Sequence, residues 1–196
     1  MLENGRNRRP GGRTAAVTDR VNRAALDLLV ESGTKACTFK AVAERAGVER
    51  STLYRRYDDQ WEMMIDAIIA RAADDVMPDL TGSLVGDLKS VLRKLVETLE
   101  TPLGPALVAT AAELRAALAD DYERAYFDRR MAQLQPMFDA AIERGELSPK
   151  VDTEELFTML AGPVYFRMFI AARPVTQKWI SGLVEKVCAL FCDKAA

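Results

Sequence analysis

The stretch TFKAVAERAGVERSTLYRRY, residues 38–57, decides the fold of this chain. It predicts two short helices that cross steeply, because Ala43 is small where they would touch and Gly47 suits a tight turn between them. The angle between the two helices is expected to be filled by three apolar side chains, Val42, Val48 and Leu53. The spacing therefore predicts a helix-turn-helix.

The second helix of this motif carries hydroxyl and guanidinium groups on its expected outward face. Such groups at the start of a helix suit base edges and phosphates in the major groove of DNA. Spacing alone also fits an ordinary surface corner between two helices, but this face lacks the Glu and Lys mixture of a solvated helix. The residues expected on or near the face are Arg50, Ser51, Thr52, Tyr54, Arg55 and Arg56.

Charge is unevenly distributed along the chain, although the net charge is only −2. Residues 1–57 hold twelve Lys and Arg against six Asp and Glu, a net charge of +6, whereas the remaining residues carry a net charge of −8. A basic first third on an acidic body fits a polyanion-binding head on a body that does not bind polyanions. A chance fluctuation in surface charge is the alternative.

Histidine is absent from all 196 residues. Histidine is the most frequent general base and the most frequent transition-metal ligand. Its absence excludes zincins, Ser-His-Asp hydrolases and Cys-His proteases, and it disfavours enzymes as a class. We therefore expect no catalytic residues, no metal and no cofactor.

The cysteine count and the lengths of the apolar runs indicate where in the cell the protein is expected. The chain holds three cysteines, an odd number, and its basic start is not followed by the apolar segment of a signal peptide. No apolar run approaches the ~18 residues that span a membrane. We expect a cytoplasmic protein without a membrane partner, in which Cys188 and Cys192 are buried thiols rather than a redox or metal site.

Beyond the motif, apolar residues recur at helical spacing and no strand-like alternation occurs. We expect an all-α fold of about nine helices. Its parts are a flexible basic arm at 1–13, a three-helix helix-turn-helix head at 14–59 and a helical body at 60–196. A helix at about 121–144 contains Pro136, which should kink it.

The sequence resembles the tetracycline-repressor (TetR) family of bacterial transcription regulators. The resemblance rests on Ala-x-x-Ala-Gly-Val at 43–48, Ser-Thr-Leu-Tyr-Arg-Arg-Tyr at 51–57 and the helix expected at 17–31. These motifs cover about residues 14–70. The resemblance implies a DNA-binding head and a body at 60–196 that dimerises and binds a small effector.

The same resemblance assigns DNA contacts residue by residue. Thr38 and Lys40 match positions that touch phosphate or the edge of the groove. Arg50, Ser51 and Thr52 match positions of the recognition helix that read bases or phosphates. These five residues are the implied core of the DNA interface.

Three further positions are assigned in this way. Tyr54 matches a phosphate-contacting tyrosine, Arg56 a groove-facing position and Tyr57 an aromatic residue that packs into the head. The chain departs from the family where a Lys usually opens the fourth helix, because it has Asp-Asp-Gln at 58–60. Whether Gln60 takes the place of the phosphate-contacting Lys is left open.

The basic arm has two interpretations. It could reach an adjacent minor groove or the phosphates, as basic arms do in other DNA-binding proteins. It could equally be a plain tail whose start varies. The arginines concerned are Arg6, Arg8, Arg9 and Arg13.

Large aromatic and methionine side chains gather in the last third of the chain. Most are expected in the core, but the resemblance implies that some line a pocket for a small apolar or amphipathic effector. The pocket candidates are Leu103, Phe127, Met131, Tyr165, Phe166 and Phe169. Three arginines are expected at the surface or at an interface, where one could orient an anionic effector: Arg124, Arg130 and Arg167.

The last two helices are candidates for a four-helix dimer seam, by resemblance and because both carry broad apolar faces. The residues expected there are Val164, Met168, Leu183, Val187 and Phe191. We expect a homodimeric regulator that binds a near-palindromic double-stranded DNA operator and acts as a repressor released by its effector. The alternatives are a helical protein-interaction module and a small helical enzyme without a recognisable catalytic constellation.

Overall fold

The computed structural model describes residues 11–117 and 121–191, with side chains for 14–116 and 127–191. Every regular element in these ranges is helical, which confirms the expected all-α fold. The elements are α1 (Gly11–Ser32), η1 (Thr34–Ala36), α2 (Phe39–Ala46), α3 (Arg50–Tyr54), α4 (Gln60–Asp75), α5 (Leu84–Leu99), α6 (Leu103–Ala117), α7 (Asp121–Glu143), α8 (Thr153–Tyr165), the π-helical turn η2 (Phe166–Ile170) and α9 (Gln177–Phe191).

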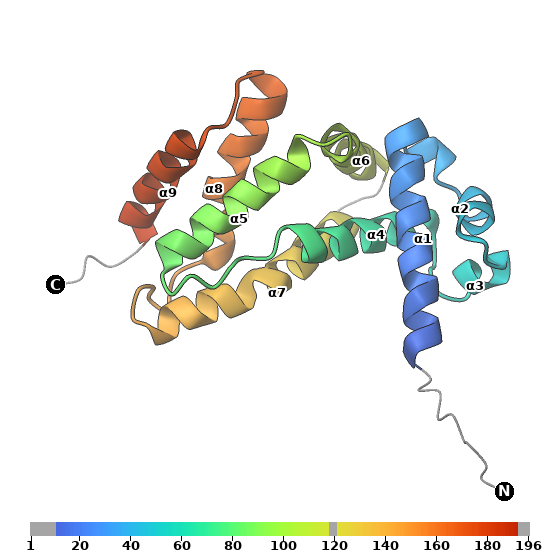
Figure 1. The fold of residues 1–196 in the computed structure, drawn as a ribbon, viewed down its shortest axis with the longest axis horizontal. Helices are drawn as coiled ribbons and strands as arrows, with labels where there is room; N and C mark the ends of the chain where they lie inside the picture. Colours follow the sequence, from blue (N-terminus) through green and yellow to red (C-terminus); the bar gives the residue numbers. More distant parts are fainter. Residues whose placement is uncertain (1–10, 118–120, 192–196) are drawn as a thin grey trace, which may run out of the picture.

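The first three helices form a head at one end of the elongated molecule, and α9 lies at the other end (Figure 1). Thr38 begins α2 by accepting a hydrogen bond at its hydroxyl from the Ala41 N–H, at 3.2 Å. Gly47 ends α2 in the left-handed conformation, at φ 62° and ψ 45°. This geometry turns the chain sharply into α3 and confirms the predicted helix-turn-helix.

The head has its own hydrophobic core, which extends beyond the three helices. Val42 and Leu53 are fully buried in it, as expected. The first half of α4 completes this core with four apolar side chains, Met63, Met64, Ala67 and Ile68. The expected boundary between residues 59 and 60 falls at the start of α4 and assigns this whole helix to the body. Because side chains of α4 lie in the head core, the helix is shared between the head and the body.

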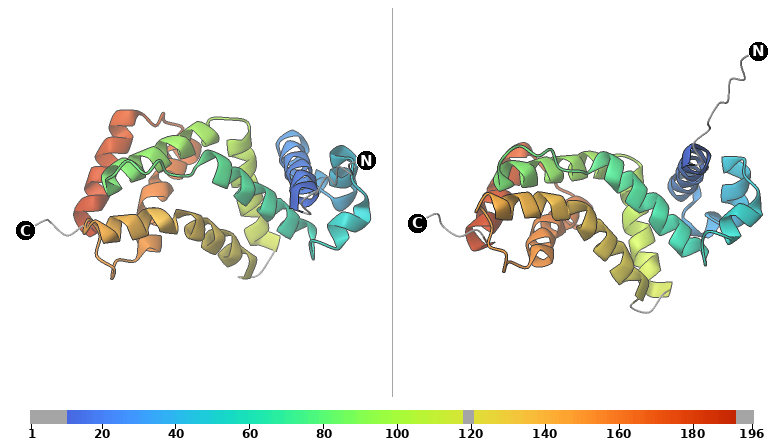
Figure 2. Two further views of the ribbon diagram at one scale, coloured as in Figure 1. Left: turned by 60° about the horizontal axis from the view of Figure 1, so that its bottom comes forward. Right: turned by 90° about the horizontal axis from the view of Figure 1, so that it is seen from below.

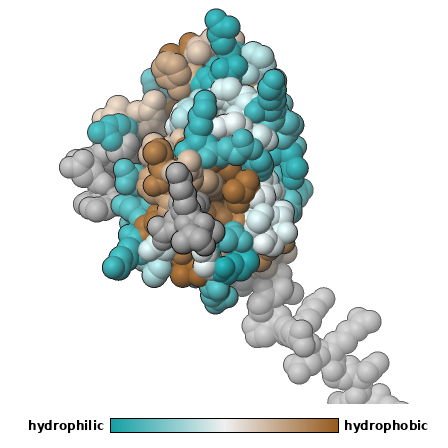
Figure 3. All heavy atoms as spheres, turned by 90° about the vertical axis from the view of Figure 1, so that its left-hand side faces the viewer, coloured by the Kyte–Doolittle hydropathy of each residue, from teal (hydrophilic) through white to brown (hydrophobic). Residues whose placement is uncertain are grey.

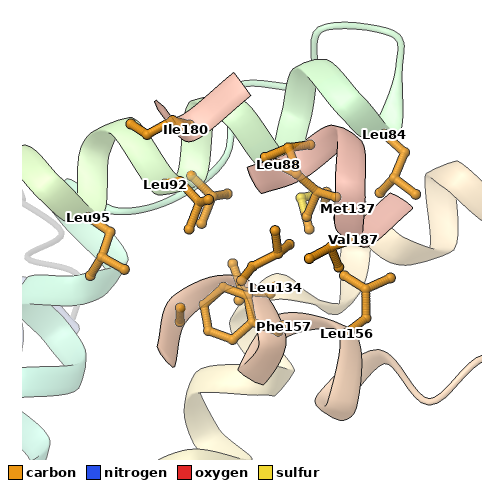
Figure 4. Packing of buried hydrophobic residues seen from close by; sticks show 14 of the residues in the cluster. Leu84, Leu88, Leu92, Leu95, Leu134, Met137, Leu156, Phe157, Ile180 and Val187 are labelled. Carbon is orange, nitrogen blue, oxygen red and sulfur yellow. The ribbon is translucent and has the colours of Figure 1, made fainter. Parts of the chain in front are cut away.

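The body is a bundle of helices around a second core. α5 and α7 contribute Leu88, Leu92 and Leu134, and α8 and α9 close the bundle with Leu156 and Ile180 (Figure 4). All five side chains are fully buried or nearly so. Burial of a Leu or Ile side chain stabilises the fold by ~1.5–3 kcal/mol, so this cluster holds the far end of the molecule together.

One boundary differs from the sequence-based expectations, and the shape of α7 agrees with them. α1 begins at Gly11, so the last three residues of the expected arm at 1–13 belong to a helix. α7 runs through Pro136 without interruption, and its ribbon bends along its length (Figure 2). A proline removes one backbone donor and crowds the preceding turn, which favours bending.

Candidate DNA-binding surface and internal cavity

The outward face of α3 carries the side chains that the sequence assigns to DNA contact. Arg50, Ser51 and Tyr54 are exposed and Thr52 is half-buried, while Leu53 points into the head core. Glu49 begins α3 without a side-chain cap, so its carboxylate does not occupy the first N–H groups of the helix. The amino end of α3 is therefore not capped by a carboxylate, and its polar side chains Arg50 and Ser51 are exposed.

Tyr54 joins the two helices of the motif. Its ring packs edge-on against Phe39, with ring centroids 4.8 Å apart and an interplanar angle of 81°. The side chain nevertheless remains 66% exposed. This contact brings the end of α3 beside the start of α2, where Thr38 is half-buried and Lys40 is exposed.

Two of the three arginines of this face have partners within the head. Arg50 forms an ion pair with Glu44 at 3.2 Å. Arg56 donates to the Thr18 hydroxyl on α1 and lies 5.2 Å from the centroid of the Tyr57 ring. Arg55 is exposed. A guanidinium group has five N–H donors in a planar fork, so these contacts can orient it while other donors face outward.

Tyr57 faces the opposite way from Tyr54, into the head core, where the resemblance places it. It is almost fully buried. Burial raises the pKa of Tyr57 to about 12. Tyr57 therefore supports the motif from behind rather than touching DNA.

The acidic segment at 58–60 begins α4 with a cap. The Asp59 carboxylate accepts hydrogen bonds from the N–H groups of Trp61 and Glu62, at 2.8 and 2.9 Å. The Glu62 carboxylate accepts from the Asp58 N–H at 2.8 Å. These carboxylates occupy N–H groups that could otherwise meet a phosphate, and Gln60 itself is half-buried. The sequence signal for this cap is Asp59 followed by Glu62 three residues later.

The arm arginines are only partly covered by the structure. Arg6, Arg8 and Arg9 lie outside the described residues. Arg13 lies within α1, but its side chain is also outside the described part. Their role stays a prediction.

An internal cavity of about 340 Å³ lies in the body. Five helices and the residue after α4 surround it, and most of its wall is apolar. Its volume falls within the ~300–1,000 Å³ of small-molecule sites. The lining residues are Ile65, Ile68, Arg71, Ala72, Val76, Leu95, Thr98, Leu107, Val108, Thr110, Ala111, Leu114, Phe127, Arg130, Phe157, Ala161 and Tyr165.

Two of the six pocket candidates, Phe127 and Tyr165, line this cavity. The structure places the other four elsewhere, because neighbouring residues on a helix face different directions. Leu103 borders an outer groove between α1 and α4, Met131 packs against the body core, and Phe166 is 60% exposed. Phe169 stacks on Tyr165, with centroids 6.3 Å apart, and does not line the cavity.

Most cavity-lining residues that were not predicted from the sequence lie on α4 and α6. The α6 contribution includes several small side chains, such as Ala111 and Thr110, which leave space where larger residues would fill it. The run GPALVATAA at 104–112 is the sequence signal for this space.

Arg130 was expected at the surface or at an interface, and that expectation is wrong. The side chain is only 6% exposed and lines the cavity. Its guanidinium donates to the backbone oxygen of Val76, which follows α4, and to the Gln133 side-chain oxygen, both at 3.0 Å. The carbonyls at a helix end need donors, so Arg130 binds α7 to the end of α4.

The other two arginines have different positions. Arg167 is half-buried, donates to the Pro174 backbone oxygen at 2.8 Å and lies 5.0 Å from the centroid of the Trp179 ring. It does not line the internal cavity. The Arg124 side chain lies outside the described part of the chain.

The expected dimer contacts divide into two groups. Val164 and Val187 are buried in the body core of a single chain, so neither is available to a partner without repacking. Met168, Leu183 and Phe191 are half-buried. The exposed apolar side chains of the same region are Met159, Phe166, Ile170 and Leu190.

We refer to these four residues, which lie on α8, η2 and α9, as the α8–α9 face. Hydrophobic surface is visible at the end of the molecule where α9 lies (Figure 3). Phe166 and Ile170 lie in the π-helical turn η2, four positions apart. No helix within the described ranges combines the length and apolarity needed to cross a membrane.

Two family models match the chain. The model of the bacterial regulatory proteins of the tetR family matches residues 23–67, and the model of the tetracyclin repressor-like C-terminal domain matches residues 77–187. The first match spans the helix-turn-helix and the second spans the body. Together they cover both parts of the fold described above.

Individual relatives agree with these matches. The uncharacterized HTH-type transcriptional regulator Rv1556 of Mycobacterium tuberculosis is 32% identical over 166 residues, 83% of this chain and 81% of the relative. HTH-type transcriptional regulator AqdR of Rhodococcus erythropolis is 30% identical over 155 residues, 78% of this chain and 74% of AqdR. The crystal structure of the TetR family transcription regulator SCO0332 has a TM-score of 0.71 at 31% identity, covering 88% of this chain and 97% of that one.

A helix-turn-helix head with a polar, basic outward face on an all-helical body defines a DNA-binding transcription regulator. The chain belongs to the TetR family of such regulators. Regulators of this family bind DNA operators and act as dimers, and the family is one of DNA-binding proteins rather than enzymes.

Proposed function

We propose that this regulator is a repressor that binds a near-palindromic operator as a homodimer and leaves DNA when a small molecule occupies the cavity. The observation that supports release of DNA by a ligand is that two side chains belong both to the cavity wall and to the core of the head. Ile68 and Leu107 line the cavity and also pack in the core of the head. A ligand that moves either side chain therefore acts on the packing of the head.

The DNA contacts belong to this proposal. Thr38, Lys40, Arg50, Ser51, Thr52, Tyr54, Arg55 and Arg56 would form one interface. It is supported by the exposure of the α3 face and by the Tyr54–Phe39 contact that joins α2 to α3. Two such heads ~34–36 Å apart would meet successive major-groove turns of the operator. A regulator of this kind works where the chromosome lies, which supports a cytoplasmic location.

A gel shift with DNA from the region upstream of the protein's own gene tests the interface. Tyr54→Ala removes a ring that is two-thirds exposed, so we expect a folded protein with at least ten-fold weaker operator binding. Leu80→Ala is the matched control, because Leu80 is equally exposed but lies between α4 and α5. A folded Tyr54→Ala protein with unchanged operator affinity contradicts this DNA face.

We propose the α8–α9 face as the dimer seam. Phe166 and Ile170 are 60% and 72% exposed, and large contiguous apolar patches on a protein surface mark interaction sites. Gly162 and Gly182 have open space where a Cβ would lie, so a second copy could approach both helices closely. Native mass measurement should show a dimer that Phe166→Asp converts to monomer, whereas the control Leu80→Asp stays dimeric.

The arm contributes charge to DNA binding in this proposal. Each phosphate contact through Arg adds to the salt dependence of the affinity. Removal of residues 1–10, which ends just before α1, should flatten the plot of log affinity against log salt. A slope that does not change on this truncation rules out a role for Arg6, Arg8 and Arg9.

A further inference from the structure

The first half of α1 lies beside α3 (Figure 1). Just after the carboxyl end of α3, Arg56 donates a hydrogen bond to the Thr18 hydroxyl of α1. Before the amino end of α3, the Nη1 atom of Arg20 lies 3.8 Å from the point where a Cβ on Gly47 would be. Gly47 begins the turn into α3, so the Arg20 guanidinium lies at this turn. Two side chains of α1 therefore border the two ends of α3.

The side chains that flank Arg20 on its own helix carry no negative charge. Residues three and four positions apart are neighbours on a helix surface. For Arg20 these neighbours are Ala16, Val17, Arg23 and Ala24. The Arg20 side chain is exposed, and it forms no hydrogen bond or ion pair with the residues that the structure describes. Its planar fork of five N–H donors is therefore available to an anion.

The acidic residues nearest to Gly47 in the sequence are Glu44 and Glu49. Glu44 forms an ion pair with Arg50 at 3.2 Å, and Glu49 is the residue before α3. Of the two arginines at the amino end of α3, Arg50 is thus paired. Within the part of the chain that the structure describes, Arg20 is not.

The place of Arg20 indicates which anion it can meet. The second helix of a helix-turn-helix enters the major groove with its amino-terminal residues toward the bases, while the helix before it crosses the phosphate backbone. A side chain at the turn between the two helices therefore lies toward the edge of the groove, where the phosphates are. Arginine suits phosphate because its fork can donate two parallel hydrogen bonds.

We infer that Arg20 binds a DNA phosphate at the edge of the groove that α3 enters. This inference rests on the proposed DNA face of α2 and α3, and it extends that face to a third helix. Phosphate contacts fix the register of a protein on DNA but carry no sequence information directly. Arg20 thus positions α3 on the operator, and a homodimer makes the contact twice.

A purely structural role for Arg20 predicts a different result. A cation near the carboxyl end of a helix stabilises the helix through its dipole, and α2 ends directly before Gly47. If Arg20 did nothing else, removal of its charge would lower the melting temperature and leave the salt dependence of DNA binding unchanged. The salt dependence therefore distinguishes a phosphate contact from support of α2.

Arg20→Met tests the phosphate contact, because it removes the charge and keeps an apolar stem. Fluorescence anisotropy measures the affinity at several salt concentrations, for a duplex from the region upstream of the protein's own gene and for a scrambled duplex of equal length. Each lost phosphate contact lowers the slope of log affinity against log salt by about 0.9, so a dimer should lose about 1.8. Both duplexes should lose affinity by the same factor, on the order of ten-fold.

Arg23 supplies the matched control, three positions later on the same helix. Its side chain is exposed and lines an outer groove between α1 and α4, together with Asp19 and Asp27, which lie four positions before and after it. Arg23→Met removes the same charge away from α3, so the wild-type slope should remain. Arg20→Lys keeps the charge and should retain most of the slope. Arg20→Gln replaces Arg20→Met if that variant does not fold.

The outcomes separate the Arg20 contact from the DNA face itself. An unchanged slope in Arg20→Met, or an equal fall in Arg23→Met, overturns the contact. A loss limited to the upstream duplex also overturns it, since a phosphate contact does not depend on sequence. If Tyr54→Ala also leaves DNA binding unchanged, the proposed DNA face fails as well. A fall in slope that is confined to changes at Arg20 and is equal for both duplexes supports the contact.

Discussion

Tyr54 and Tyr57 lie three positions apart and serve opposite purposes. Tyr54 ends α3 with its ring against Phe39 and most of its surface in solvent. Tyr57 follows the helix and is buried in the head core. Tyr57 thus supports the outward face of α3 from the head core, without being part of that face.

The head core also holds a second weak acid, Cys37, whose pKa burial raises to about 12. Because these pKa values are raised, Cys37 and Tyr57 keep their protons in the folded head at pH values where the unfolded thiol and phenol ionise. Their contribution to the free energy of unfolding is therefore full below pH ~9–10, where the unfolded groups begin to ionise, and is lost as the pH rises toward 12. We expect the free energy of unfolding, measured in urea, to fall across this window. Tyr57→Phe should reduce the fall, and the exposed Tyr54→Phe should not. An unchanged slope in Tyr57→Phe contradicts this account.

At the level of single elements, α4 depends on its first residue. Asp59 accepts two hydrogen bonds from the first turn of the helix. Asp59→Ala should lower the free energy of unfolding by about 1 kcal/mol, because the N–H groups lose their partner. Asp59→Asn keeps an acceptor and should lose much less, as thermal melting can show. Equal losses for both substitutions would mean that the charge, rather than the cap, is what matters.

The helix-turn-helix was predictable because its determinants are local. Thr38 as a cap, Ala43 at the crossing and Gly47 in the left-handed conformation act within ten residues of one another. Each of them sets a local backbone conformation, whereas the packing of the head also needs side chains from α1 and α4. The same holds for the apolar faces that predicted the other helices.

The cavity was predictable only in part, because its wall comes from five helices. Phe127 and Tyr165 could be chosen as large aromatic residues, but Ile68 and Leu107 read as ordinary core positions in the sequence. Arg130 gave no signal at all, since a buried arginine and a surface arginine look alike in a sequence. Direction and burial were decided by packing between distant segments.

At the level of the whole molecule, α4 connects the two cores. Its first half completes the head core, and Val76, just after its end, belongs to the body core. A fragment ending at residue 59 lacks Met63, Met64 and Ile68, and it should not fold. A fragment ending at residue 75 retains them and should melt cooperatively, as circular dichroism can measure. Equal, cooperative melting of both fragments would place the boundary before α4.

The sequence by itself determined the class of fold and the outward face of α3 that we propose meets DNA, because capping, turn chemistry and helical periodicity act between near neighbours. The tertiary structure alone decided where empty space lies, that Arg130 faces it, and that Val164 and Val187 are buried while Phe166 and Ile170 are exposed. These properties depend on which helices pack together. Helical periodicity predicts which face of a helix is buried, but which segment covers that face, and where space is left, depends on contacts between segments that are far apart in the chain.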